Sequence, residues 1–273
     1  MHSRTTRIPC LSAFPIALLI LTALWPLGSA AQDPTPQPED SLLPRAGKAA
    51  QQFVERLGMV RYTEHLTQVK LQENGKVAYH QEGFYDSLTM VRKEAGRLSV
   101  DASAEQGLRS AGFEVRPLLI TTGFSTLALV LHPSYEGSFR FTRLEDEVIE
   151  GRSLPRLHFE YVEGADSPTA LRLRGRNYPL ALSGTIWLDP ETASVVRVEA
   201  ALAEPMEDVG LKELRCDVRY AAVVLPESSQ AWWLPVSASV ELQTPTQRWR
   251  NVHIFSKYQK YAVDILVTTG ETP

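Results

Sequence analysis

The chain has 273 residues, of which 44% are hydrophobic and 22% charged, and its formal net charge is −4. This length fits one large all-β domain or two small ones, and the apolar content is sufficient for a real core. The acidic balance argues against nucleic acid or an anionic lipid surface as the main partner.

The first 31 residues have the three parts of a secretory signal peptide. Arg4 and Arg7 form a basic start, residues 11–25 form an apolar run, and residues 28–31 (GSAA) offer a cleavage site. The alternative is a retained membrane anchor, which would need about 20 apolar residues. The sequence therefore predicts a periplasmic protein with no integral membrane segment after cleavage.

The two cysteines exclude several kinds of site. Cys10 precedes the apolar run, whereas a lipoprotein signal places its cysteine after that run, so lipidation is not expected. Removal of the signal leaves Cys216 alone, which excludes a disulfide, a cysteine-based metal cluster and a redox pair. Cys216 lies in the alternating run LRCDVRY and is expected to be a small buried residue.

Residues 32–44 contain four prolines and few apolar side chains, which predicts an extended linker. Residues 45–57 are good helix formers and predict a short amphipathic helix that packs on the sheet. The predicted organisation is thus a signal peptide (1–31), a linker (32–44) and a single domain (45–273). The apolar stripe of the helix consists of Ala49, Phe53, Val54 and Leu57.

A long hairpin is predicted over residues 60–90, with its turn at Asn74-Gly75, because this pair tolerates the positive φ angles of a type I′ turn. A third strand is expected at 96–101. The alternation in the first strand is mixed, so the register of this hairpin stays open. The apolar residues that do not share one face are Tyr62, Leu66, Val69 and Leu71.

Residues 102–112 and 123–132 are the candidates for inserted helices. In the second segment, Ser125 is a possible N-cap and Pro133 a stop signal. Its apolar run is too continuous for an exposed helix, so other parts of the chain must cover it.

Residues 184–200 (GTIWLDPETASVVRVEA) predict a second hairpin, whose turn begins at Asp189-Pro190. Asp can hydrogen-bond the backbone just ahead of it, and Pro presets φ for a type I corner. The predicted dry face holds Ile186, Leu188, Val196, Val198 and Ala200, and the wet face holds Thr185, Trp187, Arg197 and Glu199.

From Phe139 to the end of the domain, strand-like runs follow one another with polar turns between them. Roughly ten to twelve strands are too many for a flat sheet. The predicted fold class is therefore mainly β (α+β): a strongly curved antiparallel sheet that forms an incomplete barrel, with an N-terminal helix and one or two inserted lid helices. No repeat of fixed period is visible, which argues against a propeller or solenoid.

Signatures of catalysis are absent from the sequence. The segment 123–127 (GFSTL) lacks the closing Gly of a nucleophile elbow, and no HExxH, phosphate loop or dinucleotide motif occurs. The acidic clusters 145–147 and 204–208 are expected to be solvated loops between strands. We therefore expect no catalytic residue, no enzymatic activity and no cofactor.

Two His–Glu pairs have a spacing that could bind a metal on one strand face, namely His80 with Glu82 and His158 with Glu160. A zinc site needs three or four converging donors, and such pairs also occur on solvated faces. We expect no metal site.

The predicted helices are too few and too short to fill the hollow of a large curved sheet. The sequence therefore predicts an apolar cavity that binds acyl chains, with full plugging by the helices as the alternative. The residues predicted to line it are Phe139, Phe141, Phe159, Tyr161, Ile186, Leu188, Val196 and Val198.

Several features are combined in this sequence: the signal, the helix, the long strands, the pattern GxIWLDPETxxVVRVE at 184–199 and the closing pair WWLPVSASVEL and NVHIFSKYQKY. Together they resemble periplasmic lipoprotein carriers of the LolA and LolB type. The resemblance covers residues 57–261 and implies an incomplete barrel with helices as a lid and an interior for lipid. An arginine links lid and barrel in the carriers, but no arginine of this sequence can be matched to it.

Two functions follow from the sequence. The first is a non-enzymatic periplasmic carrier or chaperone that binds lipid or lipoprotein acyl chains. The alternative, which the resemblance to envelope-stress sensors also allows, is a sensor or interaction module that binds another envelope protein without a small ligand. An interaction surface would use the aromatic residues Trp232, Trp233 and Trp249, which the sequence places near strand ends.

Overall fold

The structure is a computed structural model that describes residues 42–94, 97–105, 120–173, 176–226 and 228–261. The expected signal peptide and nearly all of the expected linker lie outside these residues. The described residues belong to one compact unit that spans residues 38–273.

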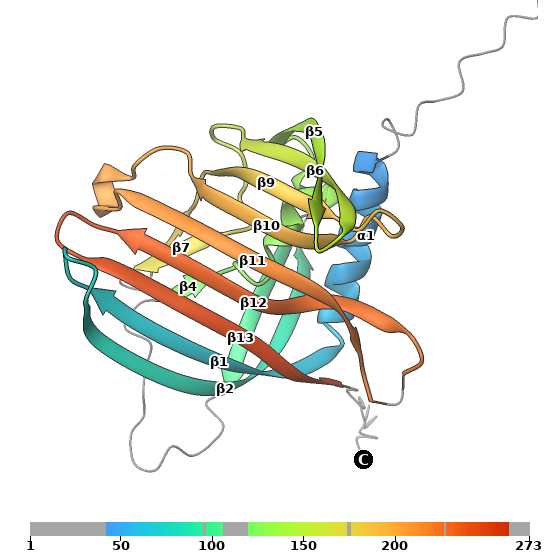
Figure 1. The fold of residues 1–273 in the computed structure, drawn as a ribbon, viewed down its shortest axis with the longest axis horizontal. Helices are drawn as coiled ribbons and strands as arrows, with labels where there is room; N and C mark the ends of the chain where they lie inside the picture. The colour runs from blue at the N-terminus through green and yellow to red at the C-terminus, as the bar shows by residue number, and fades with distance from the viewer. Residues whose placement is uncertain (1–41, 95–96, 106–119, 174–175, 227, 262–273) are drawn as a thin grey trace, which may run out of the picture. The chain divides into compact units, whose positions relative to one another are not determined.

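Ten antiparallel strands form the main sheet, which is strongly curved and does not close into a barrel (Figure 1). Its two edges, β3 and β5, do not pair with each other. The expected incomplete barrel is confirmed. In sheet order the strands are β3 (Arg97–Glu105), β2 (Val77–Glu94), β1 (Val60–Leu71), β13 (Arg248–Lys260), β12 (Ala231–Gln243), β11 (Glu213–Val224), β10 (Val195–Leu202), β9 (Leu182–Leu188), β6 (Arg152–Tyr161) and β5 (Phe139–Ile149).

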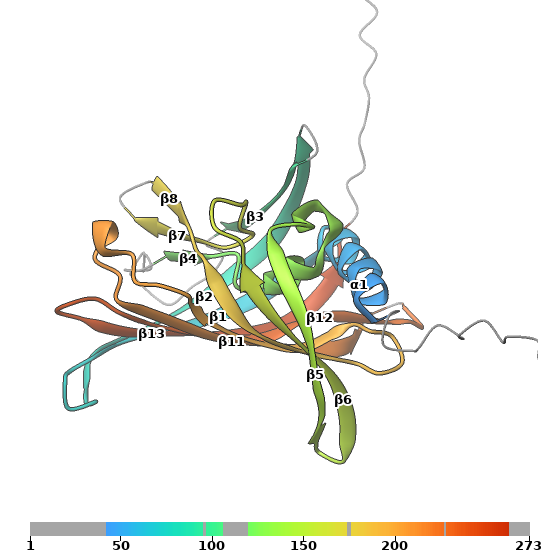
Figure 2. The same cartoon turned by 90° about the horizontal axis from the view of Figure 1, so that it is seen from above.

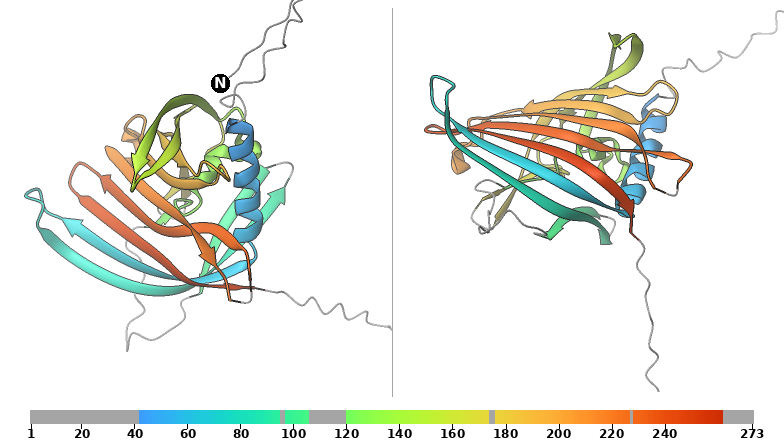
Figure 3. Two further views of the ribbon diagram at one scale, coloured as in Figure 1. Left: turned by 45° about the vertical axis from the view of Figure 1, so that its right-hand side comes forward. Right: turned by 60° about the horizontal axis from the view of Figure 1, so that its bottom comes forward.

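A second sheet and the helical segments lie on the concave side of the main sheet, as Figures 2 and 3 show. The second sheet has three strands, β4 (Ile120–Thr122), β7 (Ala170–Leu173) and β8 (Arg176–Pro179). The helical segments are α1 (Leu42–Leu57) and the short 3-10 helices η2 (Leu127–Leu131), η3 (Pro133–Tyr135) and η4 (Glu207–Val209).

Helix α1 confirms the predicted amphipathic helix but begins at Leu42, three residues earlier than expected. Its apolar face packs against the main sheet and η2, where Phe53 meets the ring of Tyr220 edge-on at 5.6 Å. Ala49 lies at the margin of this face. The buried face is Leu42, Ala46, Gly47, Ala50, Phe53, Val54 and Leu57.

The hairpin of β1 and β2 is confirmed, but its turn is not of type I′. Among the residues of this turn only Gly75 has a positive φ, of 79°, and the Gln72 N–H donates to the carbonyl of Lys76. These bonds enclose a three-residue loop with a left-handed glycine at its end, which is the common alternative to the two-residue turn. The expected third strand is confirmed and runs on to Glu105.

Of the two expected inserted helices, the first is wrong where the structure describes it, and the second is confirmed only as a short 3-10 helix. Residues 102–105 belong to β3, and the rest of the first segment lies outside the described residues. The second segment forms the 3-10 helix η2, whose N-cap is Thr126 and not Ser125. All five residues of η2 are buried, so a short tight helix satisfies the backbone while the apolar side chains enter the core.

The hairpin of β9 and β10 is confirmed, and Asp189 organises its turn as predicted. One oxygen of this carboxylate accepts hydrogen bonds from the backbone N–H groups of Glu191 and Thr192, and the other accepts from Arg152 at 2.6 Å. The turn is longer than expected, because the Asp189 N–H donates to the carbonyl of Ser194. Burial tends to raise the pKa of Asp189, but these hydrogen bonds lower it below its usual value.

Candidate functional site

The predicted cavity residues of β5 and β6 form one aromatic cluster on the concave side of the sheet. Phe139 lies opposite Tyr161, and Phe141 opposite Phe159. The Phe139 ring meets Phe159 edge-on at 5.6 Å and Tyr161 at 5.9 Å. Phe159 is fully buried and Phe139 nearly so, whereas Phe141 and Tyr161 stay partly exposed.

The predicted cavity residues of β9 and β10 continue this cluster across the sheet. Ile186 lies opposite both Leu157 and Val198, and Ile186, Leu188 and Val198 are all fully buried. The prediction for Val196 is wrong in detail, because the register shifts between Val195 and Arg197. This β-bulge places Val195 opposite Leu188 and in the core, and leaves Val196 half-buried.

Five of the eight predicted residues are thus covered by other parts of the protein. They join the same hydrophobic core as the residues of α1 and η2. The part of the concave face formed by β5, β6, β9 and β10 is therefore packed, and these five described side chains line no open trough. Whether these side chains contact a ligand stays a prediction.

A cleft remains beside this packed region, between α1, η2 and the ends of β10, β11 and β12. The cavity within it is small, about 20 Å³, which is room for about one water molecule. Small side chains create it, since Ala49 and Ala50 of α1 and Ala128 of η2 all line it. The floor includes Tyr220, whose hydroxyl accepts the N–H of Ala128 at 3.0 Å, and the wall includes Val195.

The concave face of β1, β2 and β13 has a different character. Here buried or half-buried polar side chains lie among apolar ones such as Leu66 and Phe255, and the polar ones pair across the strands. Glu64 Oε1 lies 2.6 Å from Nδ1 of His253, and the Gln68 amide donates to Asn251 at 3.0 Å. We call Glu64, Gln68, Ser87, Asn251 and His253 the polar belt.

The polar belt was not predictable from the sequence. Its only local signal was the mixed alternation of residues 60–71, in which Glu64 and Gln68 take positions on the same face as Leu66. Their partners Asn251 and His253 lie more than 180 residues away in the sequence, so no local pattern could reveal the pairing.

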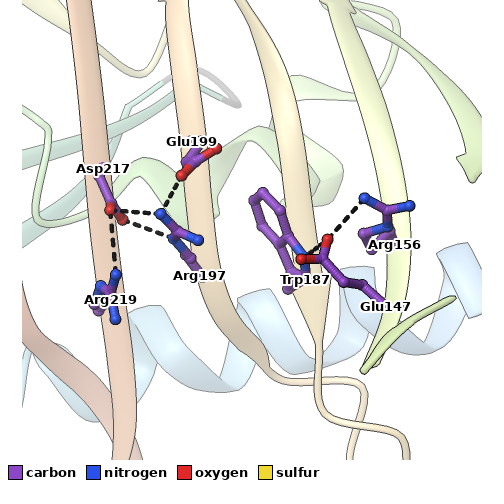
Figure 4. Close-up of polar contacts among 7 residues, drawn as sticks. All are labelled: Glu147, Arg156, Trp187, Arg197, Glu199, Asp217 and Arg219. Carbon is purple, nitrogen blue, oxygen red and sulfur yellow. Dashed lines mark hydrogen bonds and ion pairs between the residues drawn. The ribbon is translucent and has the colours of Figure 1, made fainter. Parts of the chain in front are cut away.

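The convex face of β5, β6, β9, β10 and β11 carries oppositely charged side chains that form ion pairs (Figure 4). Arg197 donates two hydrogen bonds to Asp217, at 3.0 and 2.8 Å, and lies over the Trp187 ring. Trp187 Nε1 donates to Glu147, which also accepts from Arg156 at 2.8 Å. This face is wet as predicted, but Trp187 on it is buried beneath its charged neighbours.

Glu147 also corrects one expectation. The cluster 145–147 lies within β5 and not in a loop between strands; a register shift between Leu144 and Glu147 marks the place.

The candidate metal pairs are confirmed as neighbours, with His80 and Glu82 at 3.2 Å and His158 and Glu160 at 3.5 Å. Within the described ranges, no three His, Cys, Asp or Glu side chains come together as a metal site. The Cys216 thiol is buried as predicted, and burial raises its pKa to about 12.

The tryptophans that could form an interaction surface are covered to a large extent. Trp232 is 8% exposed and lies between Arg56 of α1 and Lys260, each less than 6 Å from its ring. Trp233 and Trp249 are partly buried against the core. An interaction surface on these residues would therefore lack the Trp232 ring, whereas Trp233 and Trp249 remain partly exposed. None of the helices in the described part of the chain has the length and apolar character needed to span a membrane.

No family model and no curated protein matches the sequence. Similar solved structures include a LolA superfamily protein from Nitrosomonas europaea, with 10% identity, a TM-score of 0.40, and 80% of this chain and 94% of that chain covered. A DUF1329 family protein from Desulfovibrio piger has 10% identity, a TM-score of 0.43 and coverages of 84% and 94%. A putative outer membrane lipoprotein-sorting protein domain from Vibrio parahaemolyticus has 12% identity, a TM-score of 0.43 and coverages of 82% and 94%.

Proposed function

We propose that this chain is an exported, non-enzymatic binding protein that holds the hydrocarbon chains of a lipid or a lipidated protein on the concave side of its half-barrel. The observation that carries this proposal is the cleft between α1 and the sheet. It lies next to the packed apolar core. Small or apolar side chains line most of it, and Gln52 and Arg56 are its larger polar members.

The way α1 is attached supports this proposal. Besides its apolar face, the helix contacts the sheet through Arg45, whose guanidinium donates to the carbonyls of Pro190 and Glu191 at 3.3 and 2.7 Å. These bonds are exposed, and exposed polar contacts contribute little to stability. A movement of α1 away from β10 would widen the cleft and uncover Val195, with Leu188 beside it.

The residues predicted to bind ligand fit this arrangement as an inner surface. Val198 and Ile186 lie one and two strands further from the cleft than Tyr220, and Phe159 lies beyond them on β6. These side chains are covered in this structure, so we propose that α1 moves away from β10 and that an acyl chain then enters at the widened cleft and extends over them. The ligand site then follows the strand order from β11 to β6.

The experiment is a titration of the exported protein with N-phenyl-1-naphthylamine, a neutral dye that fluoresces in apolar sites. We expect saturable binding to the folded wild type. Ala49→Phe places a ring at the margin of the cleft, so we expect its dissociation constant to rise by about tenfold, which corresponds to about 1.4 kcal/mol.

The matched control is Lys48→Phe, which adds a ring at the neighbouring, exposed position of the same helix. It should bind the dye as the wild type does, and thermal unfolding should show that both variants are folded. Absence of saturable binding to folded wild type would contradict the proposed function. Equal affinity of Ala49→Phe and wild type would move the site away from the cleft.

A further inference from the structure

The polar belt is unusual for the inner face of a half-barrel, because its side chains are buried and face the same side as the hydrophobic core. Gln68 and Asn251 are each 1% exposed. They bond each other at 3.0 Å, in the same two strands that hold Glu64 and His253. Polar groups in such a position are normally satisfied completely.

His253 is the exception. The residue is 9% exposed, and its Nδ1 lies 2.6 Å from the Glu64 carboxylate. Its other ring nitrogen, Nε2, is buried and has no hydrogen-bond partner. An unsatisfied buried polar atom is rare in proteins and often marks the place of a water, ion or ligand.

The groups around His253 define which ligand group it could take. Glu64 already accepts one hydrogen bond from Ser87 at 3.4 Å and holds the imidazole through Nδ1. Its negative charge beside the ring disfavours an anionic ligand group. A hydroxyl fits either state of the ring, since it can donate to a neutral Nε2 or accept from a protonated one.

The polar belt is also continuous with apolar surface. The His253 ring is stacked at 6.1 Å on Phe255, which in turn meets Tyr62 edge-on at 5.7 Å. Phe255 and Tyr62 belong to the same core cluster as the buried face of α1. The side chains of Glu64 and His253 retain 17% and 11% exposure, so this polar end reaches solvent while the other end joins the core.

We propose that His253, held by Glu64, binds the hydroxyl of an uncharged amphiphile whose hydrocarbon chain lies over Phe255 and Tyr62 on the concave face. This inference rests on the proposed function and names its ligand class: neutral, hydroxyl-bearing lipids in preference to fatty acids or to fatty esters without a hydroxyl. His253 is the group that contacts the ligand, and Glu64 is a positioning residue that fixes its ring.

The test compares three competitors for the dye on the exported protein: monoolein, which carries two hydroxyls; methyl oleate, which has the same chain without a hydroxyl; and oleate, which is anionic. We expect monoolein to displace the dye at a concentration at least about tenfold lower than either of the others, the size of one good hydrogen bond to a buried group.

The informative variant is the double substitution Glu64→Leu with His253→Phe. It removes both partners, so no charge stays buried alone, and a loss of folding is less of a concern than with either single change. We expect it to bind methyl oleate as the wild type does and to lose the preference for monoolein. The matched control, Glu160→Leu with His158→Phe, removes a His–Glu pair from the convex face and should keep the preference.

Each outcome decides between the two proposals. Three results would overturn the role of His253 and leave the proposed function standing. They are equal affinities of wild type for monoolein and methyl oleate, tighter binding of oleate than of monoolein, and a preference for monoolein that survives in the double variant. Dye binding that none of the three competitors reverses would overturn the role of His253 and would also contradict the binding of acyl chains at the dye site. Absence of dye binding to the folded protein would overturn both.

Discussion

Gly184 offers a sharp test of how the two central strands are packed. It lies on β9 opposite Ala200 of β10 and Phe159 of β6. A Cβ atom at this position would lie 2.0 Å from the carbonyl oxygen of Glu199 and 2.7 Å from the Cα of Ala200. Ordinary contacts of a Cβ lie at 3.4–4 Å, and both atoms belong to the backbone and cannot rotate away.

The cost of Gly184→Ala follows from this geometry. Relief of the clash would move the two strands apart by about 1.4 Å, which breaks the neighbouring ladder hydrogen bonds. Overpacking costs about 1–3 kcal/mol and each lost hydrogen bond about 1 kcal/mol, so we expect the free energy of unfolding to fall by about 4 kcal/mol. At about 2–4 °C per kcal/mol, the melting temperature should fall by roughly 10 °C.

The assay is urea and thermal unfolding followed by far-ultraviolet circular dichroism. The control is Gly75→Ala in the β1–β2 turn, where φ is 79° but a Cβ meets nothing within 4 Å. That variant should lose only about 1 kcal/mol, from backbone strain. If Gly184→Ala is no less stable than Gly75→Ala, the close approach of β9 and β10 is refuted.

Three further changes test other parts of the fold. Phe159→Ala deletes a fully buried ring and should lower the free energy of unfolding by about 3–5 kcal/mol in urea; a loss below about 1 kcal/mol would contradict the packed core. Hydrogen bonds lower the pKa of Asp189 against the effect of burial, so its contribution to stability is present above the unfolded pKa of about 3.9 and is lost as the pH falls through the lower folded value. Asp189→Asn should therefore lose less stability than wild type on acidification. Parallel plots of unfolding free energy against pH for the two proteins would refute this. Burial raises the pKa of Cys216 to about 12, so peptide mapping should find this thiol unmodified by iodoacetamide at about pH 8 in folded protein and modified after unfolding; equal labelling in both states would contradict its burial.

The sequence was informative wherever a residue's neighbours in the chain determine its environment. Leu214, Cys216 and Val218 alternate with charged residues, and all three are buried as the period of two predicts. The turn at Asp189 was predictable for the same reason, since the carboxylate bonds the backbone two and three residues ahead. The strands and the open sheet follow from many such local patterns.

Features set by distant contacts were not predictable. A bulge leaves no signature in a run such as SVVRVEA, so the sequence could not tell that Val195 and not Val196 enters the core. The continuous apolar run at η2 fits an α-helix equally well, and only its complete burial accounts for the shorter form. The filling of the predicted trough likewise depends on how α1 and η2 sit on the sheet.

The polar belt shows what a broken alternation can mean. Glu64 and Gln68 occupy inward positions of β1, where the period of two predicts apolar side chains. Gln68 lies directly opposite Asn251 of β13, whereas Glu64 lies opposite Phe255 and contacts its diagonal neighbour His253. An inward Glu costs too much to bury alone, so its presence requires a partner, which His253 supplies. The partner in turn leaves one ring nitrogen unsatisfied. This nitrogen needs a hydrogen-bond partner, which is either solvent or a ligand. Because Nε2 of His253 is buried, a ligand is favoured.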